Sequence, residues 1–366
     1  MQHPVFVLVT TQPITELMLE ATKHRLAAAL DAVGAAVTVC RNVQQQSRAN
    51  ARMKSDCSPV TIADFASQAV VVWKLRRALG EVSLVAEEER AFISALGAEY
   101  LDSVTEAVRE VWPDATTEAV VEAVAGGSAT PGGSGFWTLD PVDGTKGFLR
   151  NQQYAIALAY IEHGRPTLAV LGCPNLSSDW EEDAATTIGH GIICFAVEGH
   201  GAFEVPAADP TAAPRRLYPE LTRPAASGRV CASVERAHGN SSAFDAVMQQ
   251  AGLPCQPLAL DSQCKYAVVA RGQAEAYLRV PSSPEYAELI WDHAAGCLIA
   301  TEAGCRVTDL AGRPLDFGRG RRLRPNAGVL CATAEWHADL LRAVAAAGVS
   351  HDGRHGRLIG TEAPLR

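Results

Sequence analysis

The chain has 366 residues, of which 48% are hydrophobic and 20% charged, and its formal net charge is −9. This length exceeds the usual size of one hydrophobic core, so it predicts two domains or one large α/β unit. The acidic balance argues against nonspecific binding to nucleic acid, which needs a basic surface, although bound cations can still draw an anionic ligand to an acidic protein.

Membrane and secretory segments are not expected. No run approaches the roughly 18 consecutive apolar residues that span a bilayer. The start, MQHPVFVLVTTQP, has neither a basic segment nor a small-residue cleavage site, so we expect a cytoplasmic protein. The ten cysteines are scattered singly and form no C-x-x-C pair, which favours reduced core thiols over disulfides or a zinc site.

The first half of the chain predicts helices followed by a sheet. Helical apolar periodicity covers residues 14–37 and 64–79, and further helices are expected near 100–112 and 116–124. EVSLVAEEE predicts a short strand that runs into acidic residues, and GGSATPGGSG predicts a loop because it lacks the Gly-Lys-Ser/Thr ending of a P-loop. FWTLD, YAIALAYI, PTLAVLG and GIICFAV then predict strands of an antiparallel or mixed sheet.

A stretch rich in Pro, Ala, Arg and Ser at residues 206–228 is the candidate domain boundary. Beyond it, strand and helix patterns alternate to the end of the chain, which favours a layered α/β arrangement. We therefore expect an N-terminal α+β domain over residues 1–210 and a C-terminal α/β domain over residues 225–366. No internal repeat is found.

The segment LDPVDGT, residues 139–145, carries the strongest chemical signal. The strand is expected to end at Leu139 or Asp140, since Pro141 cannot donate a ladder hydrogen bond. Asp140 and Asp143 can then converge with the Val142 carbonyl between them, an all-oxygen ligand set that suits Mg²⁺. The next two residues, Gly144 and Thr145, would open a helix whose free amides can seat a phosphate. The structural alternative is an ordinary turn.

Three further acidic positions are weak when each is taken alone. Asp64 is predicted near the first turn of a helix, where it could merely offset the helix dipole. Glu87 and Glu88 could begin a solvated helix. Asp292, before a small and apolar helix pattern, could be an N-cap.

Taken together and in order, these segments resemble the Mg²⁺-dependent, lithium-sensitive phosphatase superfamily that includes inositol monophosphatase, and most closely its 3′(2′),5′-bisphosphate nucleotidase branch. The matching pieces are SPVTIADFASQA, VAEEE, WTLDPVDGTKGFLR, QYAIALAYIEHGRPTLAVLGCPNL, SVERAH, LDSQCKYAVVARGQAEAYLRV and WDHAAGCLIATEAGCRVTD. They extend from about residue 58 to residue 309. The resemblance implies the layered αβαβα sandwich of this superfamily.

The resemblance also implies a set of metal ligands for two to three Mg²⁺ ions. Glu87, Asp140 and the Val142 carbonyl would hold one ion, Asp140, Asp143 and Asp292 a second, and Glu87 would help to hold a third. Asp64 and Thr145 resemble the pair that orients and deprotonates the attacking water. Clustered cations fit this chemistry, because they lower the pKa of a bound water and neutralise charge on the phosphoryl group.

For the substrate, the resemblance implies contacts from His238, Ser262, Lys265 and Arg279, together with Gly144 and Thr145. A lone lysine on a helix is usually solvated, and His238 could be a plain loop residue. The basic run at residues 318–325 resembles a family loop near the base, but as a charge run it also fits an exposed face.

Three positions depart from the family pattern. Ala86 replaces the glycine usual before the acidic pair, Asn151 stands where glycine is common, and Cys305 replaces the second glycine of the EAGG pattern. None of these changes removes a ligand.

The sequence therefore predicts a Mg²⁺-dependent phosphatase that removes the 3′ or 2′ phosphate from an adenosine bisphosphate and releases AMP. One alternative keeps the chemistry but takes an inositol phosphate, a sugar phosphate or a nucleoside phosphate of a specialised pathway. A second alternative is a catalytically silent ligand-binding relative. A small phosphorylated nucleotide is the expected partner, with no nucleic acid and no membrane, and the choice between monomer and homodimer stays open.

Overall fold

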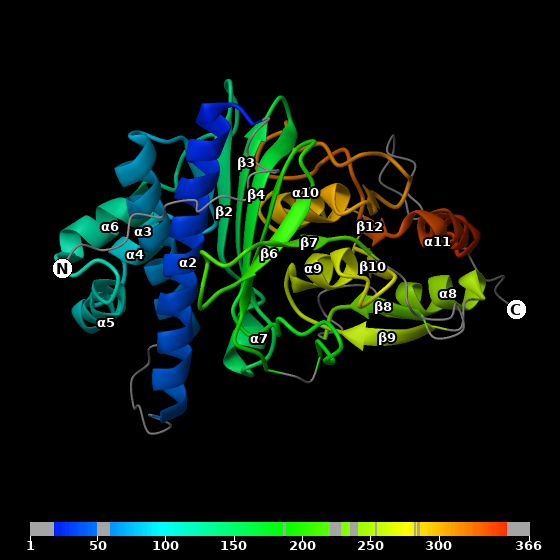
Figure 1. Ribbon diagram of the computed structural model, residues 1–366, viewed down its shortest axis with the longest axis horizontal. Helices are drawn as coiled ribbons and strands as arrows, with labels where there is room; N and C mark the ends of the chain where they lie inside the picture. Colours follow the sequence, from blue (N-terminus) through cyan, green and yellow to red (C-terminus); the bar gives the residue numbers. More distant parts are fainter. Residues whose placement is uncertain are drawn as a thin grey trace, which may run out of the picture.

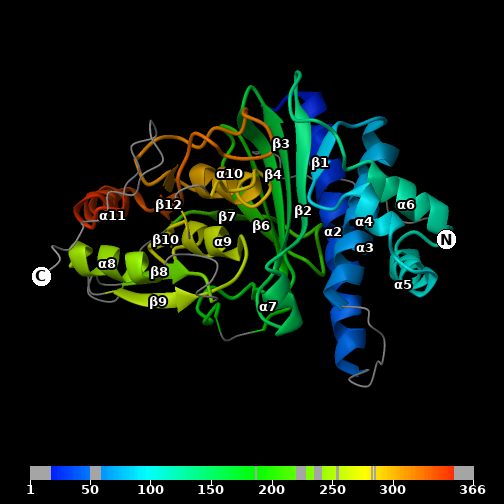
Figure 2. The same ribbon diagram turned by 180° about the vertical axis from the view of Figure 1, so that it is seen from behind.

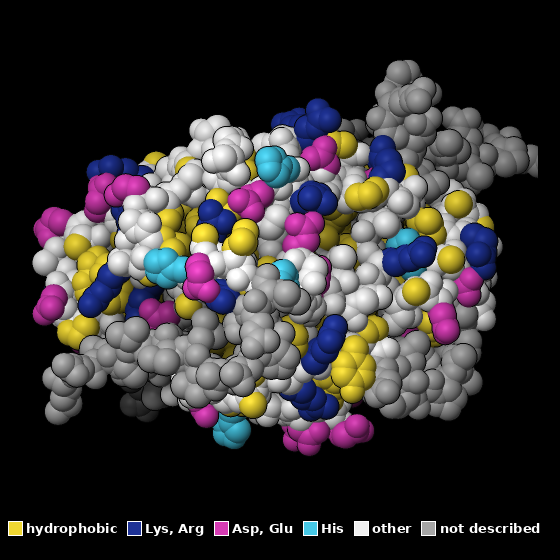
Figure 3. Space-filling view, turned by 45° about the horizontal axis from the view of Figure 1, so that its top comes forward, with side chains coloured by type: hydrophobic (Ala, Val, Ile, Leu, Met, Phe, Trp, Pro, Cys, Tyr) yellow, Lys and Arg dark blue, Asp and Glu magenta, His cyan; other side chains and the backbone are white. Residues whose placement is uncertain are grey.

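The structure, a computed structural model, describes residues 18–49, 59–185, 188–219, 228–234, 241–252, 255–281, 283 and 286–349. Five layers stand side by side across the molecule, in the order helices, sheet, helices, sheet, helices (Figure 1). This is the layered αβαβα sandwich expected from the sequence. Figure 3 shows basic, acidic and hydrophobic side chains interspersed over one face, so on this face the acidic charge is not gathered into one patch.

The first layer contains two long helices, α2 (Glu20–Ala49) and α3 (Pro59–Leu79), which pack against each other and against the first sheet. Three short helices lie on the same side of the sheet (Figure 2): α5 (Ala98–Arg109) and α6 (Thr117–Ala125) pack against α3, and α4 (Arg90–Ser94) packs against α6. The helix over Glu20–Ser47 has the length and composition to cross a membrane, but 61% of its most apolar window is buried in the fold. Its packing against α3 and the sheet is that of a core helix.

The second layer is a seven-stranded sheet with the strand order β1-β2-β3-β4-β5-β6-β7. Strand β1 is parallel to β2, and every other neighbouring pair is antiparallel. The strands are β1 (Leu84–Ala86), β2 (Phe136–Asp143), β3 (Ala155–Glu162), β4 (Arg165–Cys173), β5 (Ile192–Val197), β6 (Ala202–Pro206) and β7 (Arg215–Leu217). The mixed sheet predicted from the sequence is confirmed, with β6 and β7 as additional strands.

The two faces of this sheet carry different side chains. On β3, Ile156 and Leu158 belong to the apolar core that α2 and α3 form, whereas Ala155, Ala157 and Ala159 belong to the core beneath the middle helices. Successive strand residues point to opposite faces of a sheet. The large residues therefore face the outer helices and the small residues face the middle helices, so helices cover both faces of this sheet.

The middle layer holds α9 (Cys264–Ala270) and α10 (Ala294–Glu302), which pack between the two sheets. Helix α10 is rich in small residues and approaches its neighbours closely. A Cβ on Gly296 would lie 2.2 Å from the ring of Tyr266. The two middle helices are therefore in close contact at this glycine.

The fourth layer is a five-stranded sheet with the order β11-β12-β10-β8-β9, and α8 (Ser241–Ala251) and α11 (Ala334–Ala346) form the outer layer. Its strands are β8 (Gly228–Ala232), β9 (Cys255–Ala259), β10 (Ala276–Arg279), β11 (Arg306–Thr308) and β12 (Val329–Ala332). The alternation predicted for this half is confirmed apart from β11, a three-residue strand with too short a pattern to recognise.

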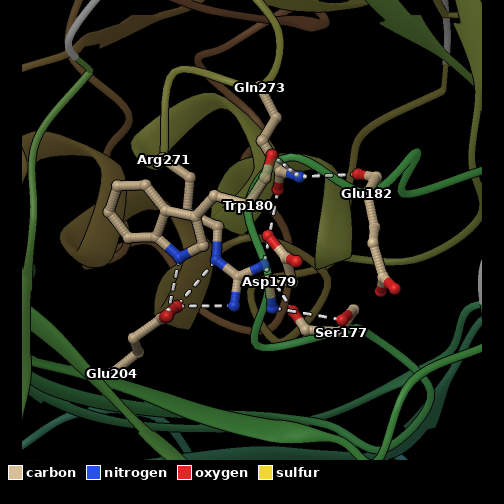
Figure 4. A network of polar contacts seen from close by, with 7 residues as sticks. All are labelled: Ser177, Asp179, Trp180, Glu182, Glu204, Arg271 and Gln273. Atoms are coloured by element: carbon tan, nitrogen blue, oxygen red, sulfur yellow. Dashed lines mark hydrogen bonds and ion pairs between the residues drawn. The ribbon is translucent and has the colours of Figure 1, made fainter.

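A buried polar network ties the middle layer to the first sheet (Figure 4). The Arg271 Nε donates to a Glu204 carboxylate oxygen at 2.6 Å, and the Trp180 indole N–H donates to the other oxygen at 2.7 Å. Gln273 donates to the backbone oxygens of Trp180 and Glu182 at 2.9 and 3.1 Å. These bonds satisfy charged groups that are almost wholly removed from water.

The predicted end of the strand before Pro141 is wrong, because β2 continues to Asp143. Its pairing with β3 shifts register between Asp140 and Asp143, so the residues between them need no regular ladder bond. A proline is tolerated at such an irregularity.

The thiols agree with the expectation of a reduced protein. The eight cysteines whose side chains the structure describes are free, and seven of them are buried. Burial is the main cause that raises the pKa of Cys231 and Cys297 to about 12, which keeps both thiols protonated at neutral pH.

Candidate active site

The register shift at the end of β2 directs the two aspartates of LDPVDGT. Asp140 accepts a hydrogen bond from the Val142 N–H at 3.1 Å, and Ser67 of α3 donates to the Pro141 carbonyl at 2.8 Å. Asp143 accepts a hydrogen bond from the Gln263 N–H at 2.6 Å. Local turn bonds and contacts from two distant segments therefore hold both carboxylates in place.

Both the backbone conformation at position 144 and the close approach of Ser262 require a glycine there. The φ of Gly144 is +86°, and an added Cβ would lie 2.9 Å from the Ser262 Cβ. It is the N-cap of the short helix α7 (Thr145–Leu149), so the predicted helix after LDPVDG is confirmed. Ser262 itself has a φ of +66°, a left-handed conformation that costs a non-glycine residue energy and that is found preferentially at functional sites.

A cavity of about 510 Å³ opens where these segments meet. Its lining comes from the ends of β1 and β2, from the segments that flank α9 and α10, and from β10. The lining residues are Glu87, Asp140, Val142, Asp143, Gly144, Thr145, Lys146, Ser233, Asp261, Ser262, Gln263, Lys265, Tyr277, Arg279, Tyr286, Leu289, Asp292 and His293.

Ten of the twelve residues singled out from the sequence line this one cavity. The eleventh, Asp64, is outside the lining, but its carboxyl interacts electrostatically with Glu87, Glu88 and Asp140. It lies in the second turn of α3 and not in the first turn as predicted, because the helix begins at Pro59. His238 lies outside the described residues.

The carboxylates of the site destabilise one another's charged forms. Burial is the main cause that raises the pKa of Asp140, and the charges of Glu87, Asp143, Asp292 and Asp64 add to it. The pKa of Asp292 is raised by burial and then by Asp143. Carboxylates that gather at one place repel one another, and a hard divalent cation relieves this repulsion by binding their oxygens. These residues therefore fit bound Mg²⁺.

Glu87 and Glu88 belong to the same acidic group. Loss of solvation and the charge of Asp143 raise the pKa of Glu87. Burial, with Glu87 and Glu89 nearby, raises the pKa of Glu88 to about 7. Glu87 does not begin a helix, since the next helix begins at Arg90; the residue is exposed and lines the cavity.

The cavity also contains cationic groups. Lys265 is buried, and its Nζ donates to the Leu260 carbonyl at 3.2 Å. Burial lowers the pKa of Lys265, whereas the charge of Asp143 opposes that effect. Arg279, on β10, forms an ion pair with Glu288 at 2.7 Å. Lys265 and Arg279 therefore place positive charge in the same cavity as the acidic group.

Several residues of the site were not predicted from the sequence. Gln263 donates through its side chain to the Trp291 carbonyl at 2.8 Å and accepts from the Gly296 N–H at 3.0 Å, so it joins the Asp143 and Asp292 segments. In the sequence, only the position of Gln263 in the LDSQ segment points to a role in the site.

Arg321 is the second unpredicted residue, and it comes from the basic run. Its Nη2 donates to the Ala86 carbonyl at 3.1 Å, and its guanidinium lies 4.7 Å from the centre of the Trp291 ring. It therefore contacts the residues that directly precede Glu87 and Asp292, two acids that lie far apart in the chain.

The chain belongs to the inositol monophosphatase family, whose sequence model matches residues 20–348. This is a family of Mg²⁺-dependent phosphatases. The chain is 38% identical over 301 residues to a 3′(2′),5′-bisphosphate nucleotidase of Schizosaccharomyces pombe, which covers 79% of this chain and 84% of the relative. It is also 38% identical over 342 residues to a protein of the same name from Oryza sativa, which covers 87% of this chain and 93% of the relative.

Solved structures support the fold. An inositol monophosphatase from Anabaena matches with a TM-score of 0.56 at 20% identity, over 89% of this chain and 97% of its own. An inositol monophosphatase from Zymomonas mobilis matches with a TM-score of 0.57 at 17% identity, over 89% of this chain and 100% of its own. The architecture expected from the sequence resemblance is thus confirmed.

Proposed function

We propose that this protein is a Mg²⁺-dependent phosphatase that removes the 3′ or 2′ phosphate from adenosine 3′(2′),5′-bisphosphate and yields AMP and phosphate. The observation that carries the proposal is the convergence of Glu87, the Asp140–Asp143 segment and Asp292 on one cavity that also contains cationic residues. The names of the relatives from Schizosaccharomyces pombe and Oryza sativa support the choice of substrate.

We propose that oxygen ligands of this cavity hold two to three Mg²⁺ ions. We assign these ligands to Glu87, Asp140, the Val142 carbonyl, Asp143 and Asp292. Bound Mg²⁺ would lower the pKa of a water molecule and offset charge on the phosphoryl group.

Asp64 and Thr145 are assigned to orient and deprotonate the attacking water. The charge of Glu87 and Glu88 acts on Asp64 in addition to its burial, and together they raise its pKa, which makes its carboxylate a stronger proton acceptor than an exposed one. The phosphate to be cleaved is placed against Gly144 and Thr145 at the start of α7.

The second anionic group of the substrate is assigned to Lys265 and Arg279, with Ser262 as a hydrogen-bond donor. His238, which the family resemblance also implies, is retained as a substrate contact. An arginine fork can bind a phosphate in a bidentate manner, whereas a lysine provides a point charge.

A phosphate-release panel tests the substrate class. It compares adenosine 3′,5′-bisphosphate with 5′-AMP, an inositol monophosphate and a sugar phosphate, with Mg²⁺ or with a chelator. We expect Mg²⁺-dependent release that is fastest with the bisphosphate. Faster release from the inositol or sugar phosphate would move the enzyme to that substrate class, and no release from any compound would favour a silent ligand-binding relative.

We further propose a cytoplasmic location. The eight cysteines whose side chains are described are all free, which supports this location because such thiols persist in a reducing compartment.

A further inference from the structure

Four side chains link the molecular core to the cavity in an unbroken series. The Tyr266 hydroxyl lies 2.9 Å from the His293 Nδ1, and the His293 Nε2 lies 3.4 Å from one Glu288 oxygen. The other Glu288 oxygen accepts the Arg279 Nε–H at 2.7 Å. Arg279 is the member of this series that the substrate assignment already uses.

The series is buried at Glu288 and His293 and is partly exposed at Arg279. The side chains of Glu288 and His293 are each only 2% exposed, whereas that of Arg279 is 17% exposed. The Leu323 N–H donates to the Glu288 carbonyl at 2.8 Å, which fixes the backbone of Glu288 as well. A guanidinium has five N–H donors, so the bond through Nε leaves donors for a ligand in the cavity.

We propose that Glu288 is a positioning residue for substrate specificity: it holds the Arg279 guanidinium in the orientation that binds the second, non-reacting phosphate. The inference rests on the proposed function, since it requires a substrate with two phosphates. Its physical basis is preorganisation, because a long and flexible arginine otherwise loses conformational entropy when it binds. The Tyr266 hydroxyl fixes the His293 ring, which contacts the second oxygen of Glu288 and restricts the rotation of its carboxylate.

A competing role for Glu288 is metal ligation. Ligand atoms of Glu288, Asp292 and His293 lie within 4.8 Å of one another. However, a cation at Glu288 would face the guanidinium that Glu288 already binds, and the two positive charges would repel each other. The ion pair with Arg279 is therefore the better assignment, and the two roles have different consequences for kinetics.

The test compares adenosine 3′,5′-bisphosphate with adenosine 3′-monophosphate, which has the same reacting ester but lacks the second phosphate. In Glu288→Gln we expect KM for the bisphosphate to rise about tenfold, the effect of weakening one charged hydrogen bond. The kcat for both compounds, the KM for the monophosphate and the Mg²⁺ concentration for half-maximal activity should stay within about twofold of wild type. In an Arg279→Gln background, Glu288→Gln should cause no further loss.

Glu204→Gln is the matched control, because it breaks another buried carboxylate–arginine pair outside the cavity. It is expected to lower the melting temperature without changing the ratio of kcat/KM between the two nucleotides. If Glu288→Gln does not fold, Glu288→Asp keeps the charge but withdraws it by one carbon, and a fall of about threefold in the same ratio is expected.

The outcomes separate the inference from the proposed function. A wild-type enzyme that hydrolyses neither nucleotide overturns both. A wild-type enzyme that prefers the bisphosphate, with an equal preference in the Glu288 variant, overturns the inference alone. A parallel loss with both nucleotides, or a large rise in the Mg²⁺ requirement, also overturns it, because Glu288 would then serve the fold or the metal.

Discussion

Asp64 combines burial with a set of acidic neighbours, and both raise its pKa. We predict that Asp64→Asn lowers kcat by at least about a hundredfold, the usual contribution of a general base. The variant should melt at the wild-type temperature or above it, since an uncharged amide of the same shape removes repulsion with Glu87 and Glu88. Phosphate release and a thermal melt check the two parts of the prediction.

Asp102→Asn is a suitable control, because Asp102 is an exposed residue of α5 and its substitution should change neither quantity. If Asp64→Asn turned over substrate at the wild-type rate, the assignment of Asp64 as the base would be wrong.

Arg321 supports the acidic group through its hydrogen bond to the carbonyl of Ala86, the residue before Glu87. We predict that Arg321→Lys raises the Mg²⁺ concentration for half-maximal activity about tenfold, as is typical when a residue that supports a metal ligand is replaced. Lysine cannot both bond to the Ala86 carbonyl and stack on Trp291 as a planar guanidinium does. Arg319→Lys is the control, because Arg319 is an exposed residue of the same loop. An equal Mg²⁺ requirement in the two variants would contradict the prediction.

The acidic residues of the site could be predicted from the sequence, whereas the residues that hold them in position could not. Asp140 and Asp143 could be identified because proline, glycine and paired aspartates have strong local preferences. Gln263 and Arg321 act through contacts with residues remote in sequence. Glu288 pairs with Arg279 across a turn of the chain, and no local pattern encodes either kind of contact.

The helix α7 illustrates how an element tolerates a departure from the family pattern. Asn151 follows this helix with a φ of +56°, a conformation that glycine and asparagine adopt most readily. We predict that Asn151→Val lowers the free energy of unfolding by about 1–2 kcal/mol, while Asn151→Gly changes it by less than about 0.5 kcal/mol. Urea titration of both variants checks this, and equal stability of the valine variant would argue against the left-handed conformation.

Most elements were predicted with boundaries in error by a few residues, because apolar periodicity identifies the middle of an element and not its ends. The largest error is at α2, which was predicted to end near residue 37 but runs to Ala49. The error at the end of β2 arose because a rule for proline in regular ladders was applied to an irregular one. Strands as short as β11 contain only three residues and show no measurable periodicity.

For the whole molecule, the acidic group links stability to pH. In the metal-free protein, burial first and neighbouring charge second raise the pKa of Asp140 and Asp292. A carboxyl whose pKa is higher in the folded state contributes stability below its unfolded pKa and loses that contribution as pH rises through its folded pKa. The metal-free protein should therefore become less stable as the pH rises from acidic to neutral.

Mg²⁺ should reverse this trend, because it binds the deprotonated carboxylates. At roughly a hundred times its dissociation constant, one Mg²⁺ adds about 2.7 kcal/mol of stability. We predict that the difference in melting temperature between Mg²⁺-containing and chelator-treated protein grows with pH over this range. A difference that is independent of pH would contradict the prediction.

The layered architecture was predictable as a class, because alternating strand and helix patterns require a sheet covered by helices. The contacts that join the middle helices to the first sheet were not predictable. The buried Arg271–Glu204 pair and its bond to Trp180 join segments from both halves of the chain, and only the folded structure brings them together.

The central claim is that acids from distant segments bind divalent ions together in one cavity. The most direct measurement is anomalous X-ray scattering from crystals soaked in Mn²⁺, a scattering substitute for Mg²⁺. The account predicts anomalous peaks in contact with the carboxylates of Asp140, Asp143, Asp292 and Glu87. Peaks confined to other surfaces, with these four side chains free of metal, would contradict it.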